Sequence, residues 1–171
     1  MTDAVALRDG VGIIKFTPMV KTTFSRKELE QLFLPYNEKG KQIWVITKVK
    51  KLPGEIVNMA LHLAELDFIR YIRICNKTLA ASSENYHKRP KVPVTIMNHP
   101  TAIGIQILYN VESKYIDFFD INSPEKGNGS KMVDAVLTNF PLNWQATVVM
   151  DLSNGFWNRM KQKHPECNWM M

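Results

Sequence analysis

Two glycines and two lysines in one short turn are the residues of this chain best suited to chemistry. Residues 123–131 read Ser-Pro-Glu-Lys-Gly-Asn-Gly-Ser-Lys, and Gly127 and Gly129 directly precede a stretch with helical periodicity. Glycine lets the backbone approach a ligand closely, and the free amides at a helix start attract an anion. Lys126 and Lys131 add positive charge beside them. The pattern indicates a site for a phosphate or diphosphate. The open alternative is that both glycines serve only a tight turn.

This turn lies between a predicted strand and a predicted helix. Tyr115–Asn122 is a nearly continuous apolar run, which is typical of a strand covered on both faces. After the turn, apolar residues recur at spacings of three and four up to Phe140, so we expect a helix that Pro141 ends. Residues 144–150 are β-branched and aromatic and predict the next strand. Such a strand–helix–strand unit places its two strands parallel, and ligands bind near their carboxyl ends.

The turn differs from the two common nucleotide-binding motifs. A Walker loop has four residues between its first glycine and a Gly-Lys-Ser/Thr triplet, and the dinucleotide fingerprint has three glycines. Instead, residues 124–129 resemble the acyl-CoA loop of the GNAT family of N-acyltransferases, Gln/Arg-x-x-Gly-x-Gly/Ala between a strand and a helix. Both glycines match, and Pro124 replaces the first Gln or Arg. The resemblance covers residues 94–160, with strands, loop and helices in the family's order.

The resemblance implies an α/β fold of mixed α+β type, with a central mixed sheet, a βαβ acyl-CoA core and flanking helices. We expect one domain over residues 1–171, with 1–91 as the acceptor-side half and 92–171 as the acyl-CoA-binding half. The implied activity is transfer of an acetyl group from acetyl-CoA, or of another acyl group from its CoA thioester, to a primary amine. The amine attacks the thioester directly, and no metal takes part. The residues expected to bind the carrier are Phe119, Asp120, Ile121, Lys126, Gly127, Asn128, Gly129, Ser130, Lys131 and Trp157.

Acid and base candidates are few. Asp117 and Asp120 lie on the predicted strand before the loop, and strict alternation places them on opposite faces. We take Asp117 as the candidate base and favour an ordinary hydrogen-bonded or edge position for Asp120. Much of the family uses the tyrosine of a Phe-Tyr pair on the last helix as the acid. Here the matching pair is Phe156-Trp157, and indole cannot donate that proton, so either another group such as Ser153 serves or no acid is needed.

Three departures from the family leave a second function open. They are Pro124 in the loop, the missing tyrosine and a C-terminus with room for only one short strand near residues 168–171. The acceptor wall that further strands normally build must come from a second subunit in a homodimer or from the first half of the chain. The alternative is a non-catalytic GNAT-like module that binds nucleic acid or a protein partner. A third option is a nucleotide-binding protein unrelated to the family.

The charge of the chain is unevenly distributed. Residues 1–91 hold 16 Lys and Arg against 9 Asp and Glu, a net of +7, whereas residues 92–171 hold 6 against 7, a net of −1. We therefore expect an acceptor or partner with acidic character, such as an acidic protein or a nucleic acid, tRNA included. The two cysteines, Cys75 and Cys167, lack metal-binding spacing. Two cysteines of this kind are typical of reduced thiols in the cytoplasm, and the sequence shows no secretory signal and no apolar run of membrane-spanning length. We therefore expect a cytoplasmic protein without membrane contact.

In the first half of the chain, some helix and strand boundaries can be predicted and others stay open. Residues 9–17 predict a first strand and residues 42–49 another. Ser25 and Glu28 form a capping box, which predicts a helix to about Phe33, ended before Pro35. Residues 55–81 favour one long or kinked helix, with residues 69–75 as a strand left open. If this stretch is helical, Arg70, Arg73 and Lys77 form a basic ridge.

Residues 82–91 are polar and end in His-Lys-Arg-Pro-Lys, so we expect a loop over the acceptor site. A strand at residues 92–97, a turn at Asn98-His99-Pro100 and a strand at 101–110 follow. Asp151 or Ser153 caps the last helix, which His164-Pro165 stops.

Overall fold

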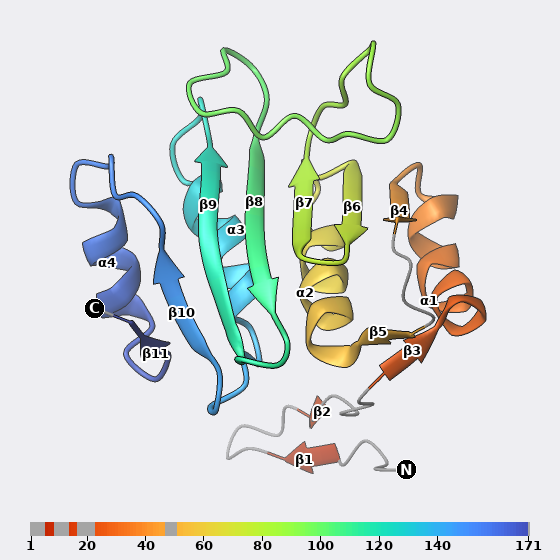
Figure 1. The fold of residues 1–171 in the computed structure, drawn as a ribbon, viewed down its shortest axis with the longest axis horizontal. Coiled ribbons are helices and arrows are strands. Elements are labelled where there is room, and N and C mark those ends of the chain that lie inside the picture. The colour runs from red at the N-terminus through yellow and green to blue at the C-terminus, as the bar shows by residue number, and fades with distance from the viewer. Residues whose placement is uncertain (1–5, 9–13, 17–22, 47–50, 171) are drawn as a thin grey trace.

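A mixed sheet of seven strands organises the chain, as Figure 1 shows. The structure is a computed structural model, and it describes residues 6–8, 14–16, 23–46 and 51–170. In spatial order the strands are β11 (Asn168–Trp169), β10 (Gln145–Val148), β9 (Tyr115–Asn122), β8 (Gly104–Asn110), β7 (Thr78–Ser82), β6 (Tyr71–Cys75) and β4 (Gln42–Ile46). Neighbouring strands are antiparallel from β6 to β9 and parallel at both ends of the sheet. Strands from both halves of the sequence therefore share one sheet, and the fold is mixed α/β.

The described chain contains four helices: α1 (Arg26–Glu38), α2 (Gly54–Ala64), α3 (Asn128–Leu137) and α4 (Phe156–Lys163). Helices α2 and α3 contact each other and lie behind the sheet in Figure 1. In the same view, no helix of the described chain covers the near face of β6–β9. Two small antiparallel sheets pair β1 (Ala6–Arg8) with β2 (Ile14–Phe16) and β3 (Thr23–Ser25) with β5 (Lys51–Pro53).

The core forms between the sheet and helices α2 and α3. Strands β6 and β7 bury Ile72, Ile74 and Leu79, while most residues between them stay half-exposed. The ladder continues this apolar face from Leu79 to Ile107 on β8. Burying each such side chain contributes roughly 1.5–3 kcal/mol, so this face provides much of the stability that holds the strands in register. Helix α2 supplies the facing apolar residues, which are Ile56, Val57, Met59, Ala60, Leu63 and Ala64.

The predicted strand–helix–strand unit is confirmed. Strand β9 has the predicted bounds, and β10 runs parallel to it. Helix α3 ends at Leu137 rather than near Phe140, and β10 is shorter than the predicted strand at residues 144–150. The capping box is confirmed too, since Glu28 N donates to Ser25 Oγ and Ser25 N donates to Glu28 Oε2.

The prediction that α1 stops before Pro35 is wrong. The helix continues through this proline to Glu38. A proline in a helix removes one hydrogen bond, here to the carbonyl of Gln31. Both Pro35 and Gln31 are exposed, so water can satisfy that carbonyl, and the buried Leu29 and Phe33 hold the helix against the body of the protein.

The prediction of one long helix over residues 55–81 is wrong, and the strand left open at residues 69–75 is largely correct. Helix α2 ends at Ala64, where the Lys41 ammonium donates to the carbonyls of Ala64 and Leu66. The chain then reverses into β6 and β7. The basic ridge therefore does not form, because Arg73 lies in a strand and Lys77 in the turn that follows it.

Residues 92–97 do not form the predicted strand. Pro93 forms a single β-bridge with Asn85, and the residues after it cross the sheet without regular pairing. The predicted strand at 101–110 begins only at Gly104, and α4 begins only at Phe156. The short strand near the C-terminus is confirmed as β11. Of the predicted strands at 9–17 and 42–49, residues 9–13, 17 and 47–49 lie outside the described residues.

Gly104 begins β8 directly under this crossing segment. A Cβ added there would lie 2.5 Å from the carbonyl oxygen of Val94 and 3.2 Å from that of Ala81. Neither backbone oxygen can move without shifting a strand or the crossing segment.

We predict that Gly104→Ala lowers the free energy of unfolding by roughly 1–3 kcal/mol, as overpacking does. Urea denaturation measures the change. The matched control is Gly129→Ala, where the nearest atoms to an added Cβ lie at 3.5 Å, so its unfolding midpoint stays near that of the parent. Equal midpoints for the two variants would contradict the close approach at Gly104.

Candidate functional site

The parallel pairing of β9 with β10 stops halfway along β9. The register ends at Phe118 and Val148, and a last hydrogen bond runs from Val149 N to Phe118 O at 3.2 Å. Strand β9 continues to Asn122, paired with β8 on its other edge. Beyond Phe118, the β10-side edge of β9 has no strand partner in the described part of the chain. Backbone groups at such an edge can pair with a ligand.

Strand β9 carries one extra residue where this gap opens. On the β8–β9 ladder, Gln106 pairs with Asp120 and the next residue, Ile107, pairs with Phe118. Phe119 is thus a bulge residue without an opposite residue on β8, and the residue is 43% exposed. A bulge bends the strand, increases its twist and turns its backbone groups in a new direction.

The bulge corrects the prediction that Asp117 and Asp120 point to opposite faces. Their partners on β8 are Leu108 and Gln106, which lie two residues apart and therefore on one face of the sheet. Both carboxylates consequently share the face opposite α2 and α3. Alternation failed here because it assumes one residue per ladder position, and Phe119 breaks that count.

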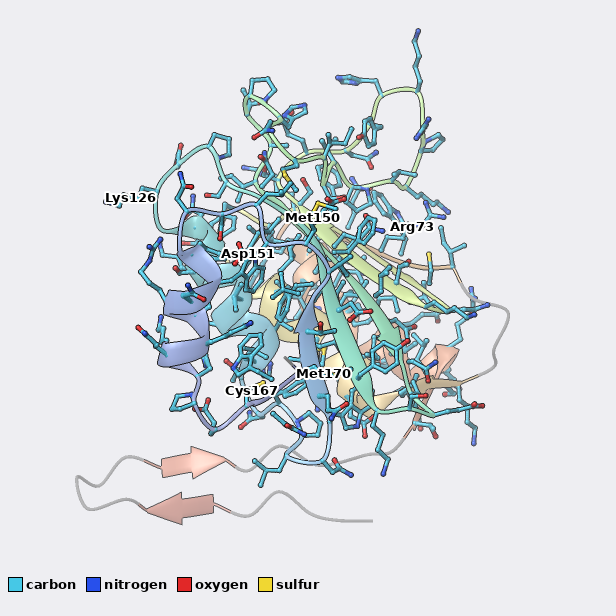
Figure 2. All side chains as sticks on the ribbon, turned by 60° about the vertical axis from the view of Figure 1, so that its left-hand side comes forward. Arg73, Lys126, Met150, Asp151, Cys167 and Met170 are labelled. Atoms are coloured by element: carbon cyan, nitrogen blue, oxygen red, sulfur yellow. The ribbon has the colours of Figure 1, made fainter. Side chains whose placement is uncertain are left out.

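A cavity of about 190 Å³ occupies the gap between the two strands. Phe118 and Trp157 are the buried members of its lining, and their ring centroids lie 4.9 Å apart. Its apolar rim is open to solvent: Met150 is 61% exposed and Leu152 65%. The complete lining is Met97, Asn98, Phe118, Phe119, Asp120, Ile121, Met150, Leu152, Ser153 and Trp157. Figure 2 shows Met150 and Asp151 on the segment that leads from β10 to α4.

The glycine turn lies at the end of β9 and begins α3. Gly127 has φ +96°, a left-handed conformation that glycine adopts without strain, and it is the N-cap residue. In the described structure, the N–H groups of Asn128, Gly129 and Ser130 have no hydrogen-bond acceptor, as expected in a first helical turn. Asn128 and Gly129 are buried, and Ser130 is half-buried. The exposed Lys126 extends outward from this loop in Figure 2.

Gly129 is buried for a local reason. An added Cβ would meet the Phe156 ring at 3.5 Å and the Ile121 Cδ1 at 3.7 Å. The start of α3 therefore packs against the first residue of α4 and the end of β9. This contact ties the turn to the strand that lines the cavity.

Ser153 reaches the cavity but already has two partners. Its Oγ donates to Asp151 Oδ1 at 2.6 Å and accepts from Trp157 N at 3.4 Å. The first bond, together with the bond from Ser153 N, lowers the pKa of Asp151. The hydroxyl proton of Ser153 is thus held by a carboxylate. The prediction that Asp151 or Ser153 caps α4 is wrong, because the N-cap residue is Gly155 and no side chain caps this helix.

Burial raises the pKa of both Asp117 and Asp120. In the described residues, neither carboxylate has an ion-pair or hydrogen-bond partner that would offset this desolvation. The two groups differ in place, because Asp120 lines the cavity and Asp117 does not. A carboxylate with a raised pKa is the stronger base of its kind. Asp120 therefore has the better position for proton transfer.

Sequence reasoning missed one wall of the cavity, which is formed by a segment of the connection between β7 and β8. Met97 and Asn98 line the cavity, and Asn98 has φ +63°. The buried Asn122 side chain fixes this segment, since its Nδ2 donates to the carbonyls of His99 at 3.0 Å and Ala102 at 2.5 Å. Only the Asn98-His99-Pro100 turn signalled it in advance, and no local pattern shows which strand such a turn will meet.

Of the predicted carrier-binding residues, the structure brings Phe119, Asp120, Ile121 and Trp157 to the cavity. Those from residues 126–131 surround the start of α3 instead. A larger cavity, of about 610 Å³, lies between α2 and the residues after α3, and it contains none of the predicted site residues.

Comparison with known proteins gave no match: no family model, no curated protein and no solved structure resembles the chain closely enough. In the described residues, no helix has the length and hydropathy to cross a membrane. The same residues contain no cluster of three or more side chains that could hold a metal ion.

The two half-buried carboxylates of Asp117 and Asp120 predict a pH-dependent stability. A folded-state pKa above the unfolded value means that the folded protein holds the proton more tightly, so stability is lost as the pH rises through that pKa. The variant Asp117→Asn/Asp120→Asn lacks this loss, and we predict that its gain in free energy of unfolding over the parent is larger at pH 7 than at pH 4. Urea denaturation at both values measures it.

Asp151→Asn is the control of opposite sign, because the pKa of Asp151 is lowered. This variant loses stability relative to the parent at pH 7 more than at low pH. If the double variant gained no more at pH 7 than at pH 4, desolvation at Asp117 and Asp120 would be ruled out.

Proposed function

We propose that this protein is an N-acetyltransferase of the GNAT type, which transfers the acetyl group of acetyl-CoA to a primary amine. One observation carries the proposal: the gap where β10 leaves β9, with an open cavity beside the free edge of β9. A thioester carrier has an extended arm with amide groups that can pair with such an edge, and a diphosphate that needs amides at a helix start.

Three further features support this reading. The turn after β9 offers the unpaired N–H groups of Asn128, Gly129 and Ser130, with Lys126 and Lys131 nearby in sequence. The bulge at Phe119 redirects the backbone of β9 beside the cavity. The cavity volume of about 190 Å³ is below the roughly 300–1,000 Å³ of typical ligand pockets. It therefore suits the acyl end of a carrier whose remainder lies along the surface.

The chemistry follows from these positions. The amine nitrogen attacks the thioester carbonyl carbon, the carbon–sulfur bond breaks, and the thiolate leaves and takes a proton from water. Asp120 accepts the proton that the amine loses, because it lines the cavity and burial raises its pKa. Holding the amine beside the thioester supplies much of the rate. Ser153 is the weaker candidate for an acid, since its hydroxyl proton is bonded to Asp151.

A binding module without turnover is the second candidate. It is favoured by the same Ser153–Asp151 bond and by Trp157, which fills the buried end of the cavity where the family places a tyrosine. Following thioester consumption in the presence of a panel of amines separates the two functions, because only the enzyme consumes the carrier.

We predict that acetyl-CoA binds and that Ser130→Asp weakens this binding at least tenfold, because the new carboxylate repels the diphosphate at the free amides. Isothermal titration calorimetry measures both affinities. The control is Asn139→Asp, an exposed residue beyond the other end of α3 with the same change in charge. Its affinity stays at the parental value. No heat from the parent protein at millimolar acetyl-CoA would exclude the proposal, and equal weakening by both variants would exclude this binding site.

A further inference from the structure

The connection between β7 and β8 contains a rigidly based, positively charged projection, residues 84–94, which we call the basic arm. Figure 1 shows it rising above β6 and β7. Its base is a short ladder: Tyr86 N donates to the Val92 carbonyl at 3.1 Å, Val94 N donates to the Glu84 carbonyl at 2.9 Å, and Asn85 bridges Pro93. Residues 87–91, His-Lys-Arg-Pro-Lys, form its tip, and all five are exposed.

The positive charge of the arm is not neutralised by the protein. In the described part of the chain, no carboxylate lies within 4 Å of Lys88, Arg89 or Lys91. The only acidic residue of the arm is Glu84 at its base, and its carboxylate accepts a hydrogen bond from Thr101 Oγ1 at 2.6 Å. Three like charges within four residues repel one another, so their clustering costs free energy that an anionic partner recovers.

A fourth cation extends this charge onto the face of the sheet. The Arg73 guanidinium donates from Nη1 to the Lys91 carbonyl at 3.5 Å and from Nε to Cys75 Sγ at 3.2 Å. Arg73 also has no carboxylate within 4 Å in the described residues. Figure 2 shows it on the other side of the molecule from Lys126, so these charges do not belong to the glycine turn.

Aromatic rings accompany the cations. The Arg89 guanidinium carbon lies 5.8 Å from the centroid of the Tyr86 ring, which is half-buried. On the sheet, Trp44 is the register partner of Arg73 and stacks on Tyr71, with ring centroids 5.8 Å apart and an interplanar angle of 17°. Residues 71 and 73 share one face of β6, so this pair and Arg73 lie on the sheet face that no described helix covers.

We propose that the basic arm, Arg73 and the Trp44–Tyr71 pair form a binding surface for single-stranded nucleic acid. Cations that no carboxylate neutralises can bind phosphates and release their counterions, and planar rings beside them stack on bases. An anionic membrane would engage the lysines and arginines but would give the stacked rings no role. An acidic protein segment would lack the planar groups that such rings bind best.

This surface is distinct from the proposed carrier site, so each proposal can be tested independently of the other. Along the sheet, Arg73 aligns through Ala80 and Gln106 with Asp120 at the cavity, three strands away. Three strand spacings amount to roughly 14 Å. A nucleic acid whose chain lies on the arm could therefore present an amine near its end to the cavity.

The test is fluorescence anisotropy of a labelled 20-nucleotide oligo(U) titrated with the full chain at several KCl concentrations. We expect binding that weakens steeply with salt. In Lys88→Glu/Arg89→Glu/Lys91→Glu, the loss of three phosphate contacts reduces the slope of log K against log salt by roughly 2 and weakens binding at least tenfold. Tyr86→Ala weakens binding roughly fivefold or more without changing that slope, because it removes stacking and not charge.

The matched control is Lys126→Glu/Lys131→Glu/Arg159→Glu, which makes the same change in charge on exposed residues outside the surface. It retains most of the parental affinity and the parental slope. Circular dichroism verifies that each variant folds, and acetyl-CoA binding by the arm variant stays at the parental value. The proposal is overturned if oligo(U) does not bind at low salt, or if the arm and control variants lose affinity for it equally. It is also overturned if vesicles with anionic lipid bind the protein while oligo(U) does not.

Discussion

The end of the β9–β10 ladder is the constraint on which the site depends. Parallel strands normally continue side by side, but here the last bond joins Val149 N to Phe118 O and the chain after it turns toward α4. Two structures hold the strands apart beyond that point. Trp157 fills the space beneath the gap, in contact with Phe118 and Trp169, and Ser153 Oγ, bonded to Asp151, accepts from the Trp157 amide at the start of α4. These contacts keep β10 away from the unpaired edge of β9, so that edge stays available to a ligand.

The bulge at Phe119 and the crossing segment at residues 93–98 complete this arrangement. The bulge places Asp117 and Asp120 on one face, and the crossing segment lies over that face, where Thr95 Oγ1 is 3.2 Å from Gln106 Oε1. Asn122 ties the residues that follow this segment to the end of β9, since its Nδ2 donates to the carbonyls of His99 and Ala102. The residues that line the cavity therefore come from four places along the chain, while a few buried hydrogen bonds fix their positions. A charged surface from the first half of the sequence begins on the same face, at Arg73.

Local patterns predicted the parts of the fold that local physics decides. An apolar run and two glycines were enough to locate β9 and the start of α3 to within two residues, and the Ser25–Glu28 pair located the start of α1. The end of α3 was placed less well, because the helix stops at Leu137, before Pro141 could end it. The failures have equally physical causes. The apolar residues of 55–81 recur at helical spacing, which favoured a helix, but pairing of residues 71–75 with β4, about thirty residues earlier in the chain, and with β7 in a hairpin makes them a strand. Neither the bulge nor the contact of Met97 with the cavity leaves a local signal, because both depend on segments that meet only in the folded chain.

The central claim is that the free edge of β9 and the start of α3 bind one thioester carrier together. Amide nitrogen–proton correlation spectra recorded during an acetyl-CoA titration test it most directly, because they report on each backbone group separately. The account predicts shifts at residues 119–121 and at 128–130 with one common saturation curve, and little change around the larger cavity between α2 and α3. Shifts confined to that larger cavity, or different affinities at the two segments, would contradict it.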